Sequence, residues 1–307
     1  MSNGHPGYFD LQVNGYAGID FNADGLSPDG LHVACERLVA DGVDAILATI
    51  ITDQLDAMCG RLSNIVRLRE QDPLAQRVIA GLHIEGPFIN ETDGYRGAHP
   101  ADAIIPAGTE AMARLFQAAG GLTRIVTLAP ERDPGLKVTR MLADQGILVS
   151  AGHTNASLGE LEAAIDAGLS MFTHLGNGCA PWMPRHDNII QRALSLAGRL
   201  WLCFIADGAH IPLFALRNYL RIAGVEHTII VTDAISAAGL GPGRYTLARR
   251  TVDVGEDLVV RSGQEGILAG SAVTMKRSEE NLLLHVGLTP LETATLTCIN
   301  PRAAVRA

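Results

Sequence analysis

The sequence predicts a parallel α/β fold, a TIM-like (β/α)8 barrel, formed as a single domain from residues 1–307. Short β-branched runs alternate with amphipathic helical stretches along the whole chain of 307 residues. Eight such runs occur, and some of them, such as residues 46–50, are apolar on both faces, as in strands that helices cover. Eight βα units favour a closed barrel, with an open doubly wound sheet as the alternative. Barrels of this length commonly form one domain.

The expected elements follow one another in strict alternation. The β-branched runs predict strands at residues 8–13, 43–50, 77–84, 123–128, 147–151, 170–174, 201–206 and 228–232. Apolar residues at helical spacing predict helices at residues 28–40, 54–70, 109–119, 134–145, 158–167, 188–197 and 212–223, and a later one around 271–286.

Two segments interrupt this alternation. Residues 87–106 form a long loop after the third strand, and long loops in compact domains are usually functional. Residues 244–261 alternate in polarity as a pair of strands, at 245–248 and 258–260, with a turn-like stretch between them. We expect this second segment to be a β-hairpin inserted after the eighth barrel strand.

Composition excludes several classes of partner. The net charge of −9 leaves no basic stripe to neutralise phosphates, so we expect no nucleic-acid binding. The most apolar run, residues 43–51, is too short to span a membrane and carries Asp44. Residues 1–7 lack the pattern of a secretory signal, and the five scattered cysteines include no CxxC pair. These features predict free thiols and a cytoplasmic protein.

Ionisable side chains gather where the predicted strands end. One histidine on a core strand is usually a structural residue, but several histidines and carboxylates on one rim are costly to bury without a shared purpose. The C-terminal ends of the strands are also the face on which barrel enzymes build their sites. The residues concerned are His83, Glu85, His153, His174, Asp207, His210 and Asp233.

A metal ion supplies such a purpose. Two imidazoles and one carboxylate from three strands, Glu85, His153 and His174, make a site with open positions for water and substrate. Asp233 is then the general base for the attacking water. His83 points to the same side of its strand as Glu85 and is expected to orient a ligand without binding metal. We expect one divalent ion, with zinc the first choice, although the same ligands accept iron, manganese or cobalt.

Several collinear motifs resemble those of the N-acetylglucosamine-6-phosphate deacetylase family, which belongs to the amidohydrolase superfamily. The resemblance covers nearly the whole chain and implies a hydrolase of carbon–nitrogen bonds other than peptide bonds. It implies the same three metal ligands, Asp233 as the acid/base, and deacetylation of N-acetylglucosamine 6-phosphate or a close N-acyl amino sugar. It also implies a homodimer. The motifs lie at residues 10–15, 82–88, 150–156, 173–175, 206–210, 231–234 and 268–271.

The resemblance implies substrate contacts as well. His99, the second catalytic residue that the resemblance implies, corresponds to the family histidine that approaches the acyl carbonyl or substrate, and His210 to the one that contacts the sugar phosphate. Arg185 lies where the family places its phosphate-binding arginine, and a planar guanidinium suits a phosphate dianion. The other implied substrate contacts are Ala98, Asn177, Gly178, Leu268, Ala269 and Gly270.

The sequence also departs from the family. Gln12 and Asn14 occupy the places where many amidohydrolases bind a second metal through two histidines, which predicts one ion per chain. The chain starts almost on the first strand and ends near residues 300–304, so we expect it to lack the flanking β-sandwich of the family. The loop at residues 176–188 is unlike the family loop, and Arg185 could instead pair with Asp187.

Two alternative functions therefore stay open. One is hydrolysis of a different N-acyl or cyclic amide, with or without a phosphate. The other is a non-catalytic protein that binds a sugar phosphate on the same barrel, against which the complete set of Glu85, His153, His174 and Asp233 argues.

Overall fold

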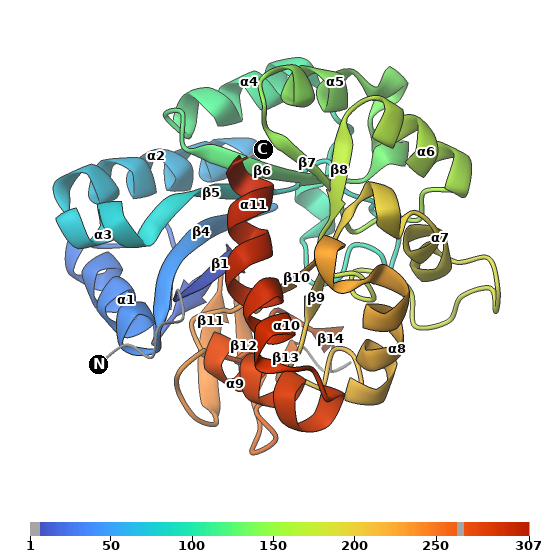
Figure 1. The fold of residues 1–307 in the computed structure, drawn as a ribbon. Helices are drawn as coiled ribbons and strands as arrows, with labels where there is room; N and C mark the ends of the chain where they lie inside the picture. The colour runs from blue at the N-terminus through green and yellow to red at the C-terminus, as the bar shows by residue number, and fades with distance from the viewer. Residues whose placement is uncertain (1–6, 263–266, 307) are drawn as a thin grey trace.

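In the computed structural model, which describes residues 7–262 and 267–306, eight parallel strands curl into a barrel (Figure 1). Each strand pairs with the next one around the barrel, and all the pairs are parallel. The order of the strands is β1 (Tyr8–Val13), β4 (Val43–Ile51), β5 (Ile79–Glu85), β6 (Thr123–Leu128), β7 (Leu148–Ala151), β8 (Leu169–Phe172), β9 (Trp201–Ile205) and β10 (Thr228–Val231).

The last strand returns to the first, so the sheet is nearly closed. Val13 forms a parallel bridge with Ala234, and the amide of Asn14 donates to the carbonyl of Ala234 at 2.7 Å. The buried carboxylate of Asp10 accepts from the hydroxyl of Thr232 at 2.5 Å. These contacts confirm the predicted (β/α)8 barrel and exclude an open doubly wound sheet.

Helices surround the barrel, as the amphipathic pattern predicts (Figure 1). Their starts follow local signals: Ser157, for example, caps a helix and forms a capping box with Glu160. The helices are α1 (Pro28–Ala40), α2 (Leu55–Gln71), α4 (Thr109–Ala118), α5 (Lys137–Asp144), α6 (Leu158–Asp166), α7 (Ile189–Ser195) and α8 (Leu213–Ala223). Short 3-10 turns are η1 (Ala101–Ala103), η2 (Pro130–Arg132), η3 (Pro134–Leu136), η4 (Ala197–Arg199) and η5 (Val225–His227).

One predicted strand starts later than expected. The strand predicted at residues 77–84 begins at Ile79, because α3 (Pro73–Val78) occupies the preceding residues. Asp72 caps this helix by accepting from the amide of Leu74, and Pro73 stands at its first position, where proline is favoured. Within the described residues, none of the helices combines the length and apolar character that crossing a bilayer requires.

The C-terminal segment closes the end of the barrel opposite the strand C-termini. The helix predicted around residues 271–286 forms as α9 (Met275–Asn281) followed by the π-helical turn η6 (Leu282–Val286). Beyond it lie α10 (Pro290–Ala294), η7 (Thr295–Ile299) and α11 (Asn300–Arg306), which the sequence did not predict. Ala304 of α11 packs with barrel-interior side chains such as Phe9 and Leu47. Figure 1 shows α11 lying across the barrel on the viewer's side.

The insertion after β10 is larger than predicted. It is a four-stranded antiparallel sheet of β11 (Gly243–Leu247), β12 (Arg250–Val254), β13 (Val260–Ser262) and β14 (Ile267–Leu268). The single hairpin predicted here is therefore wrong in its pairing. Ala248, with φ of 51°, turns the chain at once, and β12 pairs with both neighbouring strands. A second small hairpin, β2 (Gly15–Tyr16) with β3 (Ile19–Asp20), follows β1.

Candidate metal centre and active site

Three side chains converge at the C-terminal ends of the barrel strands. Glu85 is the last residue of β5, His153 follows β7, and His174 follows β8. The Nε2 atom of His174 lies 2.9 Å from Oε1 of Glu85 and 3.1 Å from Nε2 of His153. The third side of this triangle, from His153 Nε2 to Glu85 Oε1, is 3.3 Å. Donor atoms at these separations suit a single ion with ligand distances near ~2.0–2.2 Å.

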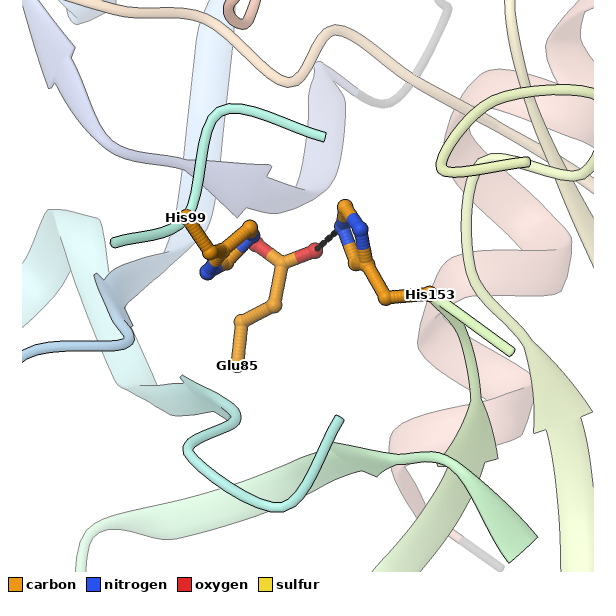
Figure 2. A group of neighbouring side chains, drawn as sticks. All are labelled: Glu85, His99 and His153. Carbon is orange, nitrogen blue, oxygen red and sulfur yellow. Dashed lines mark ion pairs between the residues drawn. The ribbon is translucent and has the colours of Figure 1, made fainter. Parts of the chain in front are cut away.

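His99 approaches the same cluster from the loop after β5. Figure 2 shows Glu85, His99 and His153 pointing toward one another, with an ion pair between Glu85 and His153. The ligand atoms of these three residues lie within 4.8 Å of one another. The set that contains His174 is tighter, so it fits the ion better, and His99 stands beside it with its ring 4.3 Å from the ring of His153.

The protonation of the cluster suits a divalent cation. Burial favours a protonated Glu85, but hydrogen bonds from His153 and His174 outweigh it and hold the pKa of Glu85 well below its usual value. Nδ1 of His153 lies 2.9 Å from the backbone carbonyl of Tyr95, to which it can only donate. This bond occupies Nδ1 of His153 and leaves Nε2 as the ring nitrogen that would bind a metal ion.

Gln12 on β1 holds the carboxylate ligand in place. Its side-chain amide donates to both oxygens of Glu85 at 3.1 Å. Its amide oxygen accepts from the hydroxyl of Thr173, the residue before His174, at 2.7 Å. Gln12 therefore links two of the ligand-bearing strands, and its oxygen is already engaged.

Asp233 follows β10 and borders the same space without completing the triangle. Asn14 donates to its Oδ1 at 2.7 Å, while Oδ1 of Asn14 has no partner among the described residues. Burial, with the nearby charge of Glu85, raises the pKa of Asp233 to about 6. Such a carboxyl group can both accept and return a proton near neutral pH.

Three of these residues have strained backbones. His153, His174 and Asp233 have φ values of 51°, 28° and 52°, in the left-handed region that favours glycine. Each of them is the second residue after the end of a barrel strand. Strain of this kind persists only where the surrounding structure holds it, and it clusters at active sites.

His83, which the sequence predicts to orient a metal ligand, makes its hydrogen bonds elsewhere. It contacts the backbone carbonyl of Leu11 through Nδ1 at 3.2 Å and the hydroxyl of Thr127 through Nε2 at 2.8 Å. Burial lowers the pKa of His83 to about 4, so the ring is neutral. No hydrogen bond joins it to Glu85 within the described part of the chain, and its contacts brace β1, β5 and β6 beneath the site.

A cavity of about 480 Å³ opens above the metal centre. Besides the three proposed ligands, Asn14, His99 and Asp233 border it. Nδ1 of His99 has no hydrogen-bond partner among the described residues, and burial lowers the pKa of His99 to about 3. The substrate contacts that the sequence predicted and that line the cavity are Ala98, Asn177, Gly178, His210, Leu268, Ala269 and Gly270.

Arg185 lies apart from this group. It is exposed on the loop of residues 176–188 and does not line the cavity. Asp187, the alternative partner, pairs instead with Arg192 at 2.6 Å. His210, by contrast, is held at the cavity by Asp207, whose Oδ2 lies 2.6 Å from Nδ1 of the ring.

Several residues of the site carry no signal that sequence reasoning could use. Ile51 and Leu247 line the cavity from β4 and from the inserted sheet, and Cys179 lines it from the loop after β8. Aliphatic residues in strands look alike in a single sequence whether or not they border a cavity. His153 contacts the backbone carbonyl of Tyr95, so the side chain at this position gives no signal in the sequence either. Thr173 stands directly before His174, inside one of the motifs of the family resemblance.

Comparison with known proteins places this geometry in a family. No protein-family model matches the sequence. N-acetylglucosamine-6-phosphate deacetylase of Bos taurus is 35% identical over 301 residues, which cover 95% of this chain and 72% of the bovine protein. N-acetylgalactosamine-6-phosphate deacetylase of Escherichia coli O157:H7 is 32% identical over 297 residues, covering 96% of this chain and 76% of that protein.

A solved structure agrees with these relatives. N-acetyl-D-glucosamine-6-phosphate deacetylase of Mycobacterium smegmatis, solved with N-acetyl-D-glucosamine 6-phosphate, superimposes with a TM-score of 0.89 at 29% sequence identity. The match covers 98% of this chain and 77% of that one. With the collinear motifs and the metal-type cluster at the strand ends, these similarities show that the chain belongs to the N-acetylglucosamine-6-phosphate deacetylase family, whose members hydrolyse a carbon–nitrogen bond other than a peptide bond.

Proposed function

We propose that the protein removes the acetyl group from N-acetylglucosamine 6-phosphate or a close N-acyl amino sugar, with one divalent ion per chain. The observation that carries the proposal is the triangle of Glu85, His153 and His174, with Asp233 beside it at the floor of one cavity. A non-catalytic binding protein has no need of this set. The relatives support the substrate class, since their names give 6-phosphates of N-acetylated amino sugars.

The residues divide the work of amide hydrolysis. A divalent ion held by Glu85, His153 and His174 supplies Lewis acidity, which polarises a carbonyl and acidifies water. Asp233, with its pKa raised to about 6, takes the proton of the attacking water and returns it to the leaving amine. His99 is neutral and buried, and its Nδ1, which has no partner among the residues that the structure describes, is suited to donate to the acyl carbonyl oxygen.

The single ion rests on Gln12 and Asn14. The oxygen of Gln12 accepts from Thr173, and Asn14 binds Asp233 through its amide nitrogen. Neutral amides are poor ligands in any case, so a second ion has no strong ligands at β1. Zinc is our first choice for the single site, and iron, manganese and cobalt fit the same ligand types.

The sugar ring is proposed to lie against Asn177, Gly178 and His210. Asp207 fixes Nδ1 of His210, which leaves its Nε2 for a hydroxyl or phosphate oxygen. Arg185 is the proposed phosphate ligand. Its loop would have to bring it to the cavity, because its side chain is exposed. A homodimer and a cytoplasmic location complete the proposal.

One observation favours a second candidate function. Because Arg185 does not line the cavity, the substrate could be an unphosphorylated N-acyl or cyclic amide that binds the same metal centre. Amine release from N-acetylglucosamine 6-phosphate, N-acetylgalactosamine 6-phosphate and their unphosphorylated forms distinguishes the two candidates. We expect a higher kcat/KM for the phosphorylated sugars. Equal or higher values for the unphosphorylated forms would favour the second function, and release from none of the four would refute the deacetylation of these sugars.

A further inference from the structure

One side of the cavity is apolar, and the inserted sheet supplies much of it. Ile51, Ala98, Leu247 and Ala269 line the cavity. They also belong to, or pack against, one hydrophobic cluster that is separate from the main core of the barrel. The other members of this cluster include buried valines of β12 and β13, such as Val252. The apolar side is therefore a wall backed by a packed layer.

The opposite side of the cavity carries two polar side chains, Asn177 and His210, beside Cys179 and Pro181. Asn177 follows β8 and His210 follows β9, whereas Ile51 ends β4 and Ala98 lies in the loop after β5. In the order of the eight strands, β4 and β8 stand four places apart, as do β5 and β9. Strands four places apart face each other across an eight-stranded barrel. The metal centre thus lies between an apolar and a polar sector.

An N-acyl amino sugar has an apolar end and a polar end, which match the two sides of the cavity. The acyl chain is a hydrocarbon and gains about 0.8 kcal/mol for each buried CH2 group. The sugar hydroxyls lose free energy on burial unless they are hydrogen-bonded. With the amide over the metal centre, the acyl chain falls on the side of Leu247, and the sugar ring falls on the side of Asn177 and His210.

The wall at Leu247 is anchored to the barrel. Leu247 is 5% exposed and ends β11, directly before the turn of Ala248 and Arg249. The amide of Ala248 donates to Asp20 at 2.7 Å. Arg249 forms ion pairs with Asp53 and with Asp102. Since the turn is held at three carboxylates, Leu247 cannot withdraw easily to admit a longer chain.

We propose that Leu247 sets the length of the acyl group that the enzyme removes, so that the inserted sheet is its acyl-specificity element. The inference rests on the proposed amide hydrolysis. Leu247 suits this role better than its neighbours. Ile51 pairs in register with Glu85, Ala98 adjoins His99, and Ala269 has only a methyl group to lose. Of these four residues, Leu247 is the one that can change the space without touching a catalytic strand.

The test compares N-formyl, N-acetyl, N-propionyl and N-butyryl glucosamine 6-phosphate, with amine release as the readout. Leu247→Ala should raise the ratio of kcat/KM for butyryl over acetyl by roughly tenfold or more, the usual range for a methylene in an apolar pocket. Leu247→Phe should shift preference the other way, toward formyl. Val252→Ala is the matched control, because Val252 is buried in the same cluster but does not line the cavity.

Each outcome has one meaning. Opposite shifts in Leu247→Ala and Leu247→Phe, with an unchanged ratio in Val252→Ala, support the proposal. If Leu247→Ala does not fold, the shift in Leu247→Phe decides alone. An unchanged kcat/KM ratio in both Leu247 variants, or an equal change in Val252→Ala, overturns the proposal about Leu247. The proposed function is unaffected by that result as long as the wild-type protein is active. No amine release by the wild-type protein from any of the four sugars or from their galactosamine 6-phosphate counterparts overturns the proposed function and this inference with it.

Discussion

The metal centre and the loop of residues 176–188 border the same cavity but are built differently. Glu85 and His174 are 2% and 3% exposed, and each contacts another functional side chain. On the loop, Trp182 is 91% exposed, and Arg185 is exposed as well. Barrel strands therefore hold the groups that we propose carry out the chemistry, whereas an exposed part of a loop carries the predicted phosphate ligand.

This difference between the strand ends and the loop indicates which part of the function the barrel determines. A ligand at a strand end is positioned by the barrel, and changing it should abolish the reaction for every substrate. A residue on an exposed loop is not held by the barrel in this way, and changing it should affect only the substrate that it contacts. Variants in the two regions should therefore fail in different ways.

The largest effect is expected at the carboxylate ligand. Glu85→Gln keeps the size of the side chain but removes the charge that a divalent ion requires, so both the bound metal and amine release should fall to background. Elemental analysis and turnover on the same sample check this. Glu110→Gln, an exposed carboxylate on α4, is the control and should change neither. A Glu85→Gln protein that keeps its metal would contradict the proposed role of Glu85 as a metal ligand.

An intermediate effect is expected at Gln12. Gln12→Met preserves shape but removes the hydrogen bonds to both oxygens of Glu85. Loss of a group that orients a metal ligand typically costs about 10–100-fold in metal affinity or activity. Competition with a chelator of known affinity measures it. Gln145→Met, on the exposed end of α5, serves as control, and equal affinities in the two variants would mean that Gln12 is dispensable.

The smallest effect is expected on the loop, at Arg185. If Arg185 binds the phosphate as proposed, Arg185→Ala removes a charge-assisted hydrogen bond, so it should raise KM for a 6-phosphate sugar by about tenfold and leave an unphosphorylated analogue unchanged. Part of the effect can appear in kcat if Arg185 positions the substrate. Arg199→Ala, exposed and paired with Asp166 at 2.6 Å, is the control. Equal changes for both sugars would assign Arg185 a structural role.

The same contrast explains what the sequence could predict. The barrel strands and the cluster of Glu85, His153, His174 and Asp233 follow from periodicity, because parallel strands end on one rim. The placement of Arg185 does not follow, because a loop's conformation depends on contacts that spacing does not encode. For a related reason, the sequence predicts one hairpin where the structure has a four-stranded sheet. The tight turn at Ala248 uses a left-handed φ on a residue that gives no turn signal.

Contacts between distant segments were also beyond single-sequence reasoning. Leu247 reaches the cavity only because the insertion folds back onto the barrel rim, where Asp53 and Asp102 hold its turn. Helix α11 is explained by tertiary packing, since Ala304 lies against the barrel interior. The sequence predicts that His83 orients a metal ligand, yet its partners are Leu11 and Thr127, since a strand side chain can bond to nearby strands as easily as to a neighbour on its own strand.

The central claim is that one metal ion and Asp233 carry the reaction. The most direct test is to titrate metal-free protein with zinc, or with the most active of the four candidate metals, while recording amine release from N-acetylglucosamine 6-phosphate. Activity should rise and reach its plateau at one ion per chain. Asp233→Asn should bind the same single ion and remain roughly 10²–10⁴-fold slower. A plateau at two ions, full activity without metal, or near wild-type turnover in Asp233→Asn would contradict the account.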